Sequence, residues 1–167
     1  MVLTKSELIA SLQNEVRILL HLASKIDRSM LDYRPSPKQR TTMDLLKYMS
    51  IMGPQMVGAA KVGFDRAAWT AASQAADARD FDQTLAQIAA QSDLYPTLLA
   101  DMSDADLRGE IDGMDGRKTT RGAFIVNLVL SGYAAYRTQL FLYLKACGRD
   151  ELSTMNLWGG VDAPVAS

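Results

Sequence analysis

The chain has 167 residues, of which 48% are hydrophobic, and its 18 Lys and Arg residues nearly balance its 19 Asp and Glu residues. This size fits a single domain, residues 1–167, with a substantial core, and the balanced charge gives no support for a nucleic-acid partner. No uninterrupted apolar run approaches the ~20 residues of a membrane span, and the N-terminus lacks the apolar core of a signal peptide, so we expect a cytoplasmic protein without a membrane partner.

The first predicted helix covers residues 5–27. Its apolar side chains recur at spacings of three and four, which places one set on a single face: Leu8, Leu12, Val16, Leu19, Ala23 and Ile26. Ile18 and Leu22 widen this face beyond what one bundle seam needs. Together with Phe141 of the last helix, they are predicted to form a homodimer interface. The only histidine, His21, is expected on the opposite side of the helix.

The second predicted helix covers residues 41–62 and follows a loop with two prolines, which break the first helix. Thr41 and Asp44 have the spacing of a capping box. Gly53 and Pro54 lie within the helix, and we expect a kink there. One face of the helix carries Tyr48, Met52, Gln55 and Ala59.

The third predicted helix covers residues 80–102, with Asp80 as its N-cap and Gln83 at the capping-box position. The connection before it, residues 63–79, is seventeen residues long, and we expect a short helix around Trp69 within it. A connection of this length can cross the whole bundle, so the second and third helices are predicted to run parallel.

The fourth predicted helix covers residues 119–147 and ends before Gly148, a residue type common at helix C-termini. Between the third and fourth helices we expect only a polar, glycine-rich turn region. The tail, residues 149–167, contains Leu157 and Trp158, which are expected to dock on the bundle. Four long helices without strand alternation predict an all-α four-helix bundle with up-down-down-up topology and a long connection between the second and third helices.

Three stretches resemble a known family. The segment LDYRPSPKQRTTMDLLKYM is similar to the entry into the second helix of DinB-like proteins. The segment GRKTTRGAFIVNLVLSGYAAYRTQLFLYLKACG resembles their last helix, and MNLWGGVD resembles a tail found in some members. The resemblance covers most of the chain and implies a DinB-like four-helix bundle of the DinB/YfiT-like superfamily of metal-dependent hydrolases.

Members of that superfamily typically hold a divalent metal ion with three histidines. The resemblance places those positions at Tyr48, Gly132 and Tyr136 of this sequence, whereas Gln139 and Arg137 match the family motif, with Arg137 expected in a structural ion pair or an interface. Glycine offers no side chain, and a neutral tyrosine, with an ordinary pKa of about 10, is a poor ligand. The departure therefore predicts a degenerate site that holds no metal and no other cofactor.

Two functional hypotheses remain open. The first is a non-metal ligand-binding or assembly protein whose candidate ligand-binding residues are Tyr48, Met52, Gln55, Gly132, Tyr136 and Gln139. In it, Tyr48, Gly132 and Tyr136 converge in the bundle interior, where the rings either contact a small-molecule ligand or only fill the space of metal and imidazoles. The alternative is an enzyme related to DinB-like hydrolases or thiol transferases, which uses a retained pocket with a tyrosine as general acid. The sequence assigns no catalytic residue.

Overall fold

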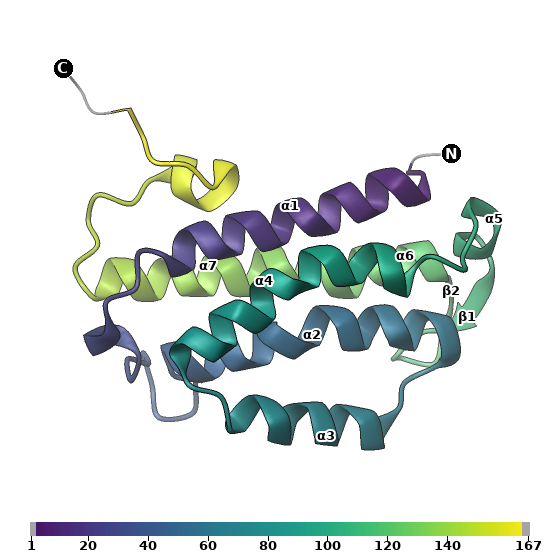
Figure 1. The fold of residues 1–167 in the computed structure, drawn as a ribbon, viewed down its shortest axis with the longest axis horizontal. Helices are drawn as coiled ribbons and strands as arrows, with labels where there is room; N and C mark the ends of the chain where they lie inside the picture. Colours follow the sequence, from purple (N-terminus) through teal and green to yellow (C-terminus); the bar gives the residue numbers. More distant parts are fainter. Residues whose placement is uncertain (1–2, 165–167) are drawn as a thin grey trace.

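The computed structural model describes residues 3–164 and shows four long helices packed side by side, as the sequence predicts (Figure 1). No helix within these residues is both long and apolar enough to cross a bilayer. The fourth bundle helix is continuous but contains a π-helical turn, η2, between two α-helical parts. The bundle comprises α1 (Lys5–Ala23), α2 (Thr42–Val62), α4 (Phe81–Leu98) and the run of α6 (Arg121–Ile125), η2 (Val126–Leu130) and α7 (Ser131–Ala146).

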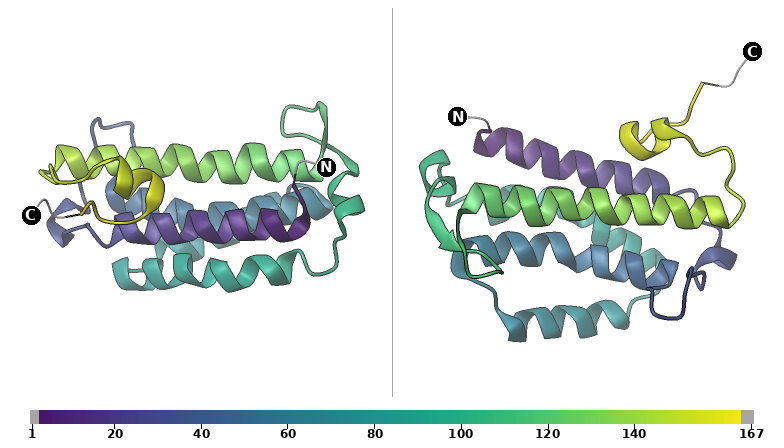
Figure 2. Two further views of the ribbon diagram at one scale, coloured as in Figure 1. Left: turned by 90° about the horizontal axis from the view of Figure 1, so that it is seen from above. Right: turned by 180° about the vertical axis from the view of Figure 1, so that it is seen from behind.

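The helices have the predicted up-down-down-up topology. Helices α1 and α7 run in one direction and α2 and α4 in the other (Figures 1 and 2). The long connection between α2 and α4 contains α3 (Arg66–Asp77), which packs along α2 and returns the chain to the end of the bundle where α2 begins. The helix expected around Trp69 is therefore present, with 12 residues, and it is the reason why α2 and α4 can run parallel.

Both predicted capping boxes are confirmed. The Thr41 hydroxyl accepts from the Asp44 N–H of α2 while the Asp44 carboxylate accepts from the Thr41 N–H, and Asp80 and Gln83 make the equivalent pair at the start of α4. These reciprocal bonds satisfy amide groups that have no partner within the helix. Helix α2 continues through Pro54 to Val62.

Two bundle helices end earlier than predicted. Helix α1 stops at Ala23, because the Ser24 hydroxyl donates to the His21 carbonyl at 2.6 Å and competes with continued helix. Helix α4 stops at Leu98, where Lys61 Nζ donates to the Leu98 carbonyl at 2.8 Å. A cation at a helix C-terminus stabilises the carbonyls left without helical partners.

The segment between α4 and α6 is more ordered than the predicted turn region. It holds a short helix, α5 (Asp104–Leu107), and two antiparallel strands, β1 (Glu110–Asp112) and β2 (Lys118–Thr120), with Ile111 opposite Thr119. Three residues are too few for an alternation pattern to be recognised, so the sequence did not reveal this hairpin. Figure 1 shows it at the end of the bundle where α2 ends.

The prediction that Ile18 and Leu22 form a dimer interface is wrong. They are 2% and 0% exposed within the single chain. Ile18 is covered by the tail, since a Cβ built on Gly160 would lie 3.0 Å from Ile18 atoms. Phe141 is half-buried against the core. The wide apolar face of α1 thus serves this chain's own tail and core, and the homodimer stays a prediction without these residues.

The described part of the tail packs beside α1 through residues 155–159. Its π-helical turn, η3 (Met155–Gly159), contacts α1, and Arg17 donates to the carbonyls of Gly159 and Gly160 at 2.9 and 3.2 Å. The buried Asn156 Nδ2 lies 3.0 Å from His21 Nε2. His21 therefore does face away from the core, as predicted, and it anchors the tail.

Candidate functional site

The first candidate site is the place where the resemblance puts the metal. Tyr48 of α2 and Tyr136 of α7 meet edge to face, with ring centroids 4.9 Å apart. The Arg40 guanidinium lies 4.1 Å from the centroid of Tyr48 and 5.9 Å from that of Tyr136. Both rings are only half-buried, so they meet at the edge of the core, whereas the prediction placed them in the bundle interior. A cation thus lies over two aromatic rings at this position.

The third metal position, Gly132, is occupied by packing. A Cβ on Gly132 would lie 3.0 Å from Cε and 3.3 Å from Sδ of Met52, which is itself buried. The flexible thioether fills the space beside the glycine. Met52 and Gly132 are therefore neighbours, but they offer a ligand no polar group beyond the thioether sulfur.

The two candidate glutamines do not contact the tyrosine pair. Gln139 Nε2 donates to the Tyr143 hydroxyl at 2.5 Å, and that hydroxyl donates to the Arg40 carbonyl at 3.1 Å. Gln139 therefore supports the loop that carries Arg40. Gln55 is half-buried and makes no side-chain hydrogen bond within residues 3–164.

The tyrosine pair has a distinct protonation behaviour. Burial, followed by the hydrogen bond and the charge of Tyr136, raises the pKa of Tyr48 to about 12, against the opposing effect of Arg40. The Tyr48 phenol is therefore neutral at neutral pH, where it can donate or accept a hydrogen bond but cannot act as a tyrosinate base.

The donor set at these positions does not fit a three-histidine metal site. It consists of two phenols and a glycine without a side chain. Within residues 3–164, no three His, Cys, Asp or Glu side chains lie close enough to share a metal ion. A catalytic zinc-type site needs about three such donors and an open position for water.

Arg137, which matches the family motif, points away from the tyrosine pair. It is buried, and its Nη1 lies 2.5 Å from a carboxylate oxygen of Glu15 on α1. Burial raises the pKa of Glu15, and the Arg137 charge opposes that shift. The ring of Trp158 lies 5.8 Å from the Arg137 guanidinium, so this ion pair also meets the tail. The expected structural ion pair is confirmed.

A cleft of about 260 Å³ lies beside Tyr48, between α2 and α3. Its polar rim carries two cations, Arg40 and Lys47, and two carboxylates, Asp44 and Asp77, and its remaining lining comes from Tyr48, Ile51, Ser73 and Ala76. Lys47 Nζ donates to the Asp77 carbonyl at 2.7 Å, whereas no carboxylate within the described residues pairs with Arg40. Among the candidate ligand-binding residues, only Tyr48 lines this cleft.

A second group of polar side chains lies in the core and was missed from the sequence. Gln91, Tyr95 and Tyr133 are completely buried and bonded to one another, with the two hydroxyls 2.6 Å apart. Gln91 Nε2 also donates to the Met49 carbonyl at 3.0 Å. Gly53 makes room for both hydroxyls. The signal available in the sequence was the pairing of Gly53 with two tyrosines at helical core positions.

Comparison with known proteins identifies the fold. No protein-family model and no curated protein matches the chain. The crystal structure of a DinB-like protein, YjoA from Bacillus subtilis, is similar, with a TM-score of 0.65 and 19% sequence identity over 87% of this chain and 94% of that one. The chain therefore has the all-α DinB-like bundle that the sequence motifs predict. At this identity the likeness concerns the fold alone.

Proposed function

We propose that this DinB-like bundle binds a small organic molecule without a metal ion, in the cleft between α2 and α3. The observation that carries the proposal is the position of Tyr48. Its ring packs against Tyr136 and the Arg40 guanidinium in the cation–aromatic cluster at the degenerate metal position, and it also lines the cleft. The other wall contributes Ser73 and Asp77 of α3. A ligand in the cleft would therefore contact the cluster through Tyr48.

The lining favours a small zwitterion. Its volume of about 260 Å³ lies below the ~300–1,000 Å³ of pockets for drug-sized ligands. Arg40 presents a planar guanidinium that pairs with no carboxylate of residues 3–164, which suits an acidic group. Asp44 and Asp77 can accept from an ammonium group on the same molecule, while Tyr48 offers its ring and a neutral hydroxyl.

This proposal assigns binding and no catalytic step. A tyrosine whose pKa is about 12 is not a base at neutral pH. The cytoplasmic location and the homodimer expected from the sequence accompany the proposal as predictions.

The proposal is tested by titrating the full-length chain with β-alanine and a set of α-amino acids, followed by NMR chemical shifts. Acetate and methylamine, which carry only one of the two charges, serve as comparison ligands. We expect saturable shifts at Tyr48 and Ser73 with zwitterions, and at least a roughly tenfold loss of affinity in Arg40→Gln. Arg34→Gln is the matched control, since Arg34 lies in the same loop and its side chain donates to the Pro37 carbonyl at 3.3 Å. Equal binding by both variants, or no saturable shift, would reject the cleft.

The metal part of the proposal has its own measurement. Elemental analysis of protein purified without a metal-affinity tag should find no stoichiometric metal. A variant with Tyr48→His, Gly132→His and Tyr136→His should gain zinc or nickel, provided that Met52 moves aside for the new side chain at position 132. Stoichiometric metal at these positions in the natural protein would refute the degenerate-site proposal.

A further inference from the structure

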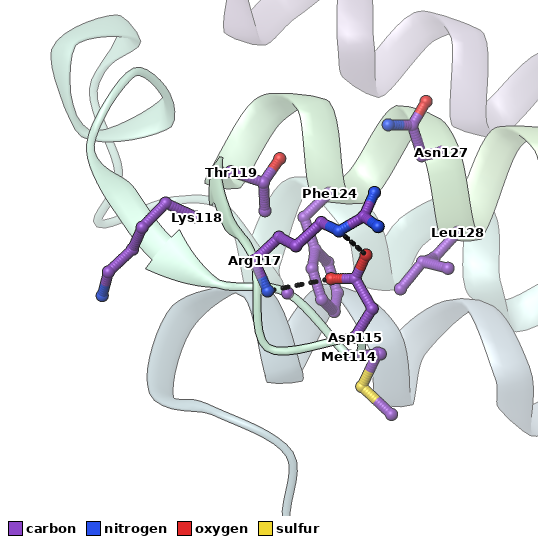
Figure 3. Close-up of a pocket in the computed structure, with 9 residues that line it drawn as sticks. Met114, Asp115, Arg117, Lys118, Thr119, Phe124, Asn127 and Leu128 are labelled. Carbon is purple, nitrogen blue, oxygen red and sulfur yellow. Dashed lines mark hydrogen bonds and ion pairs between the residues drawn. The ribbon is translucent and has the colours of Figure 1, made fainter.

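A second pocket lies at the opposite end of the bundle from the α2–α3 cleft. It has a volume of about 400 Å³. It opens between the β1–β2 hairpin and the start of the fourth bundle helix (Figure 3). Its principal side chains come from Met114, Arg117, Thr119, Phe124, Asn127 and Leu128. None of these residues belongs to the site already described, so this pocket is independent of the proposed function.

The inner wall of the pocket is apolar. The Phe124 ring is 4% exposed and lies behind the hairpin loop in Figure 3, with Leu128 beside it and Met114 at the outer edge. The Met114 side chain is 56% exposed in the loop that forms the opposite wall. The Met114 side chain points away from the Phe124 ring in Figure 3, but it is flexible and can turn toward the pocket, so the two residues offer a flat apolar group two surfaces to contact.

The rim of the pocket carries polar groups with unused hydrogen-bonding capacity. Thr119 and Asn127 make no side-chain hydrogen bond within residues 3–164. The Arg117 side chain is 88% exposed, and its Nε lies 3.6 Å from Asp115 Oδ2. An exposed ion pair of this length contributes little, so Arg117 can turn to another anion at small cost. Asp115 would retain its bond from the Arg117 backbone N–H at 3.0 Å.

The backbone beneath the rim is unusual. Asn127 and Leu128 lie within η2, the π-helical turn, where Ser131 directs both its N–H and its hydroxyl to the Val126 carbonyl. A single π-helical turn inside an α-helix interrupts the regular backbone hydrogen bonds, and such turns occur often at functional sites. The turn presents Asn127 and Leu128 together at one wall of the pocket.

We infer that this pocket binds a small aromatic carboxylate. The aromatic body would lie between Phe124 and Met114, and the carboxylate would accept hydrogen bonds from Arg117, with Asn127 and Thr119 as further donors. Lys118 is a poor alternative partner, because its ammonium lies 2.7 Å from Asp112 Oδ1 and extends away from the other side chains in Figure 3.

The test uses 2-naphthoate as the probe, with the full-length chain followed by NMR. We expect saturable binding with contacts between probe protons and Phe124, and a roughly tenfold weaker affinity in Arg117→Gln. Lys118→Gln is the matched control, because it removes the same charge from the same hairpin. It should change the affinity less than about threefold. Asn127→Ala, at an exposed position, should weaken binding without affecting the fold.

Two comparisons distinguish this site from non-specific attraction. The neutral probe 2-naphthalenemethanol should bind more weakly and should not respond to Arg117→Gln. Equal losses in Arg117→Gln and Lys118→Gln, or no saturable binding of 2-naphthoate at millimolar concentration, would overturn the inference. Neither result concerns the α2–α3 cleft, whose test uses zwitterions and Arg40.

Discussion

The bundle contains two pairs of tyrosines that differ in their surroundings. Tyr95 and Tyr133 lie in the core with both side chains 0% exposed, whereas Tyr48 and Tyr136 are half-buried between α2 and α7. The first pair is joined hydroxyl to hydroxyl, and the second pair mainly through its rings. The same residue type therefore serves two different purposes in one fold.

The buried pair has its hydrogen bonds provided by the core. The Tyr133 hydroxyl donates to Gln91 Oε1, the Tyr95 hydroxyl donates to the Tyr133 hydroxyl, and the Gln91 amide donates to the Met49 carbonyl. Burial raises the pKa of Tyr95 and of Tyr133, so both phenols are neutral. A polar group in the core is tolerable only when it is bonded in this way, and such a network fixes the relative position of its helices.

The half-buried pair keeps access to outside molecules. Tyr48 borders a cleft, and the cation above it, Arg40, comes from a loop and has no carboxylate partner within the described residues. The comparison shows that access and remaining bonding capacity, more than residue type, mark a candidate site. Three substitutions test this distinction.

The largest effect is expected from Gly53→Ala. The added Cβ would overlap the Tyr95 hydroxyl and lie 2.7 Å from the Tyr133 hydroxyl. Both rings are bonded and enclosed, so they cannot move away cheaply. We expect a loss of about 2–4 kcal/mol in the free energy of unfolding, measured by chemical denaturation.

Gly58→Ala is the matched control for that substitution. Gly58 lies in the same helix, and an added Cβ there meets no atom within 4 Å. It should raise the free energy of unfolding by about 0.5–1 kcal/mol, because alanine has a higher helix propensity than glycine. If Gly53→Ala proved as mild as Gly58→Ala, the buried pair would not be rigidly held.

The next effect is expected from Tyr133→Phe. It removes one hydroxyl that bonds both Gln91 and Tyr95, and leaves the ring in place. We expect a loss of about 1–3 kcal/mol, since the remaining polar groups are completely buried. The Tyr95→Phe variant should be non-additive with it in a double-mutant cycle. Additive losses would mean that the two hydroxyls act separately.

Much of the fold follows from local patterns. The capping boxes at Thr41 and Asp80 mark two helix starts, and the length of residues 63–79 leads to the parallel arrangement of α2 and α4. These features depend on neighbours in sequence, which is why periodicity and turn chemistry suffice for them. The resemblance of three stretches to DinB-like proteins predicts the four-helix bundle as a whole, and the similar fold of the YjoA structure confirms it.

The features that were not predicted depend on contacts distant in sequence. Ile18 looked like an interface residue because nothing in α1 shows that Gly160 covers it. Gly132 and Tyr136 were predicted to lie in the bundle interior, whereas both are only partly buried and the residues that follow them, Tyr133 and Arg137, are buried. The π-helical turn η2, which precedes α7, contains one more residue per turn than an α-helix. The spacing of apolar residues in the sequence does not reveal such a turn.

The smallest effect on stability is expected from Tyr136→Phe, which leaves the half-buried ring in place. The free energy of unfolding at neutral pH should change by about 1 kcal/mol or less. The clearer measurement is the titration of Tyr48, followed by phenolate absorbance. Two of the causes that raise its pKa to about 12 are the hydrogen bond and the charge of Tyr136, while burial, the largest cause, persists. The pKa of Tyr48 should therefore fall from about 12 toward, but not to, its ordinary value of about 10.

The same substitution makes a prediction about alkaline stability. Because the pKa of Tyr48 is higher in the folded state, its contribution to stability is fully present below about pH 10 and is lost as the pH rises toward about 12. In Tyr136→Phe this loss should be smaller and complete at a lower pH. In Tyr133→Phe the titration of Tyr48 should not change, because Tyr133 is not among the groups that shift it. A Tyr48 titration that moves in both variants would show that the two tyrosine pairs are coupled, and the distinction between a structural pair and an accessible pair would fail.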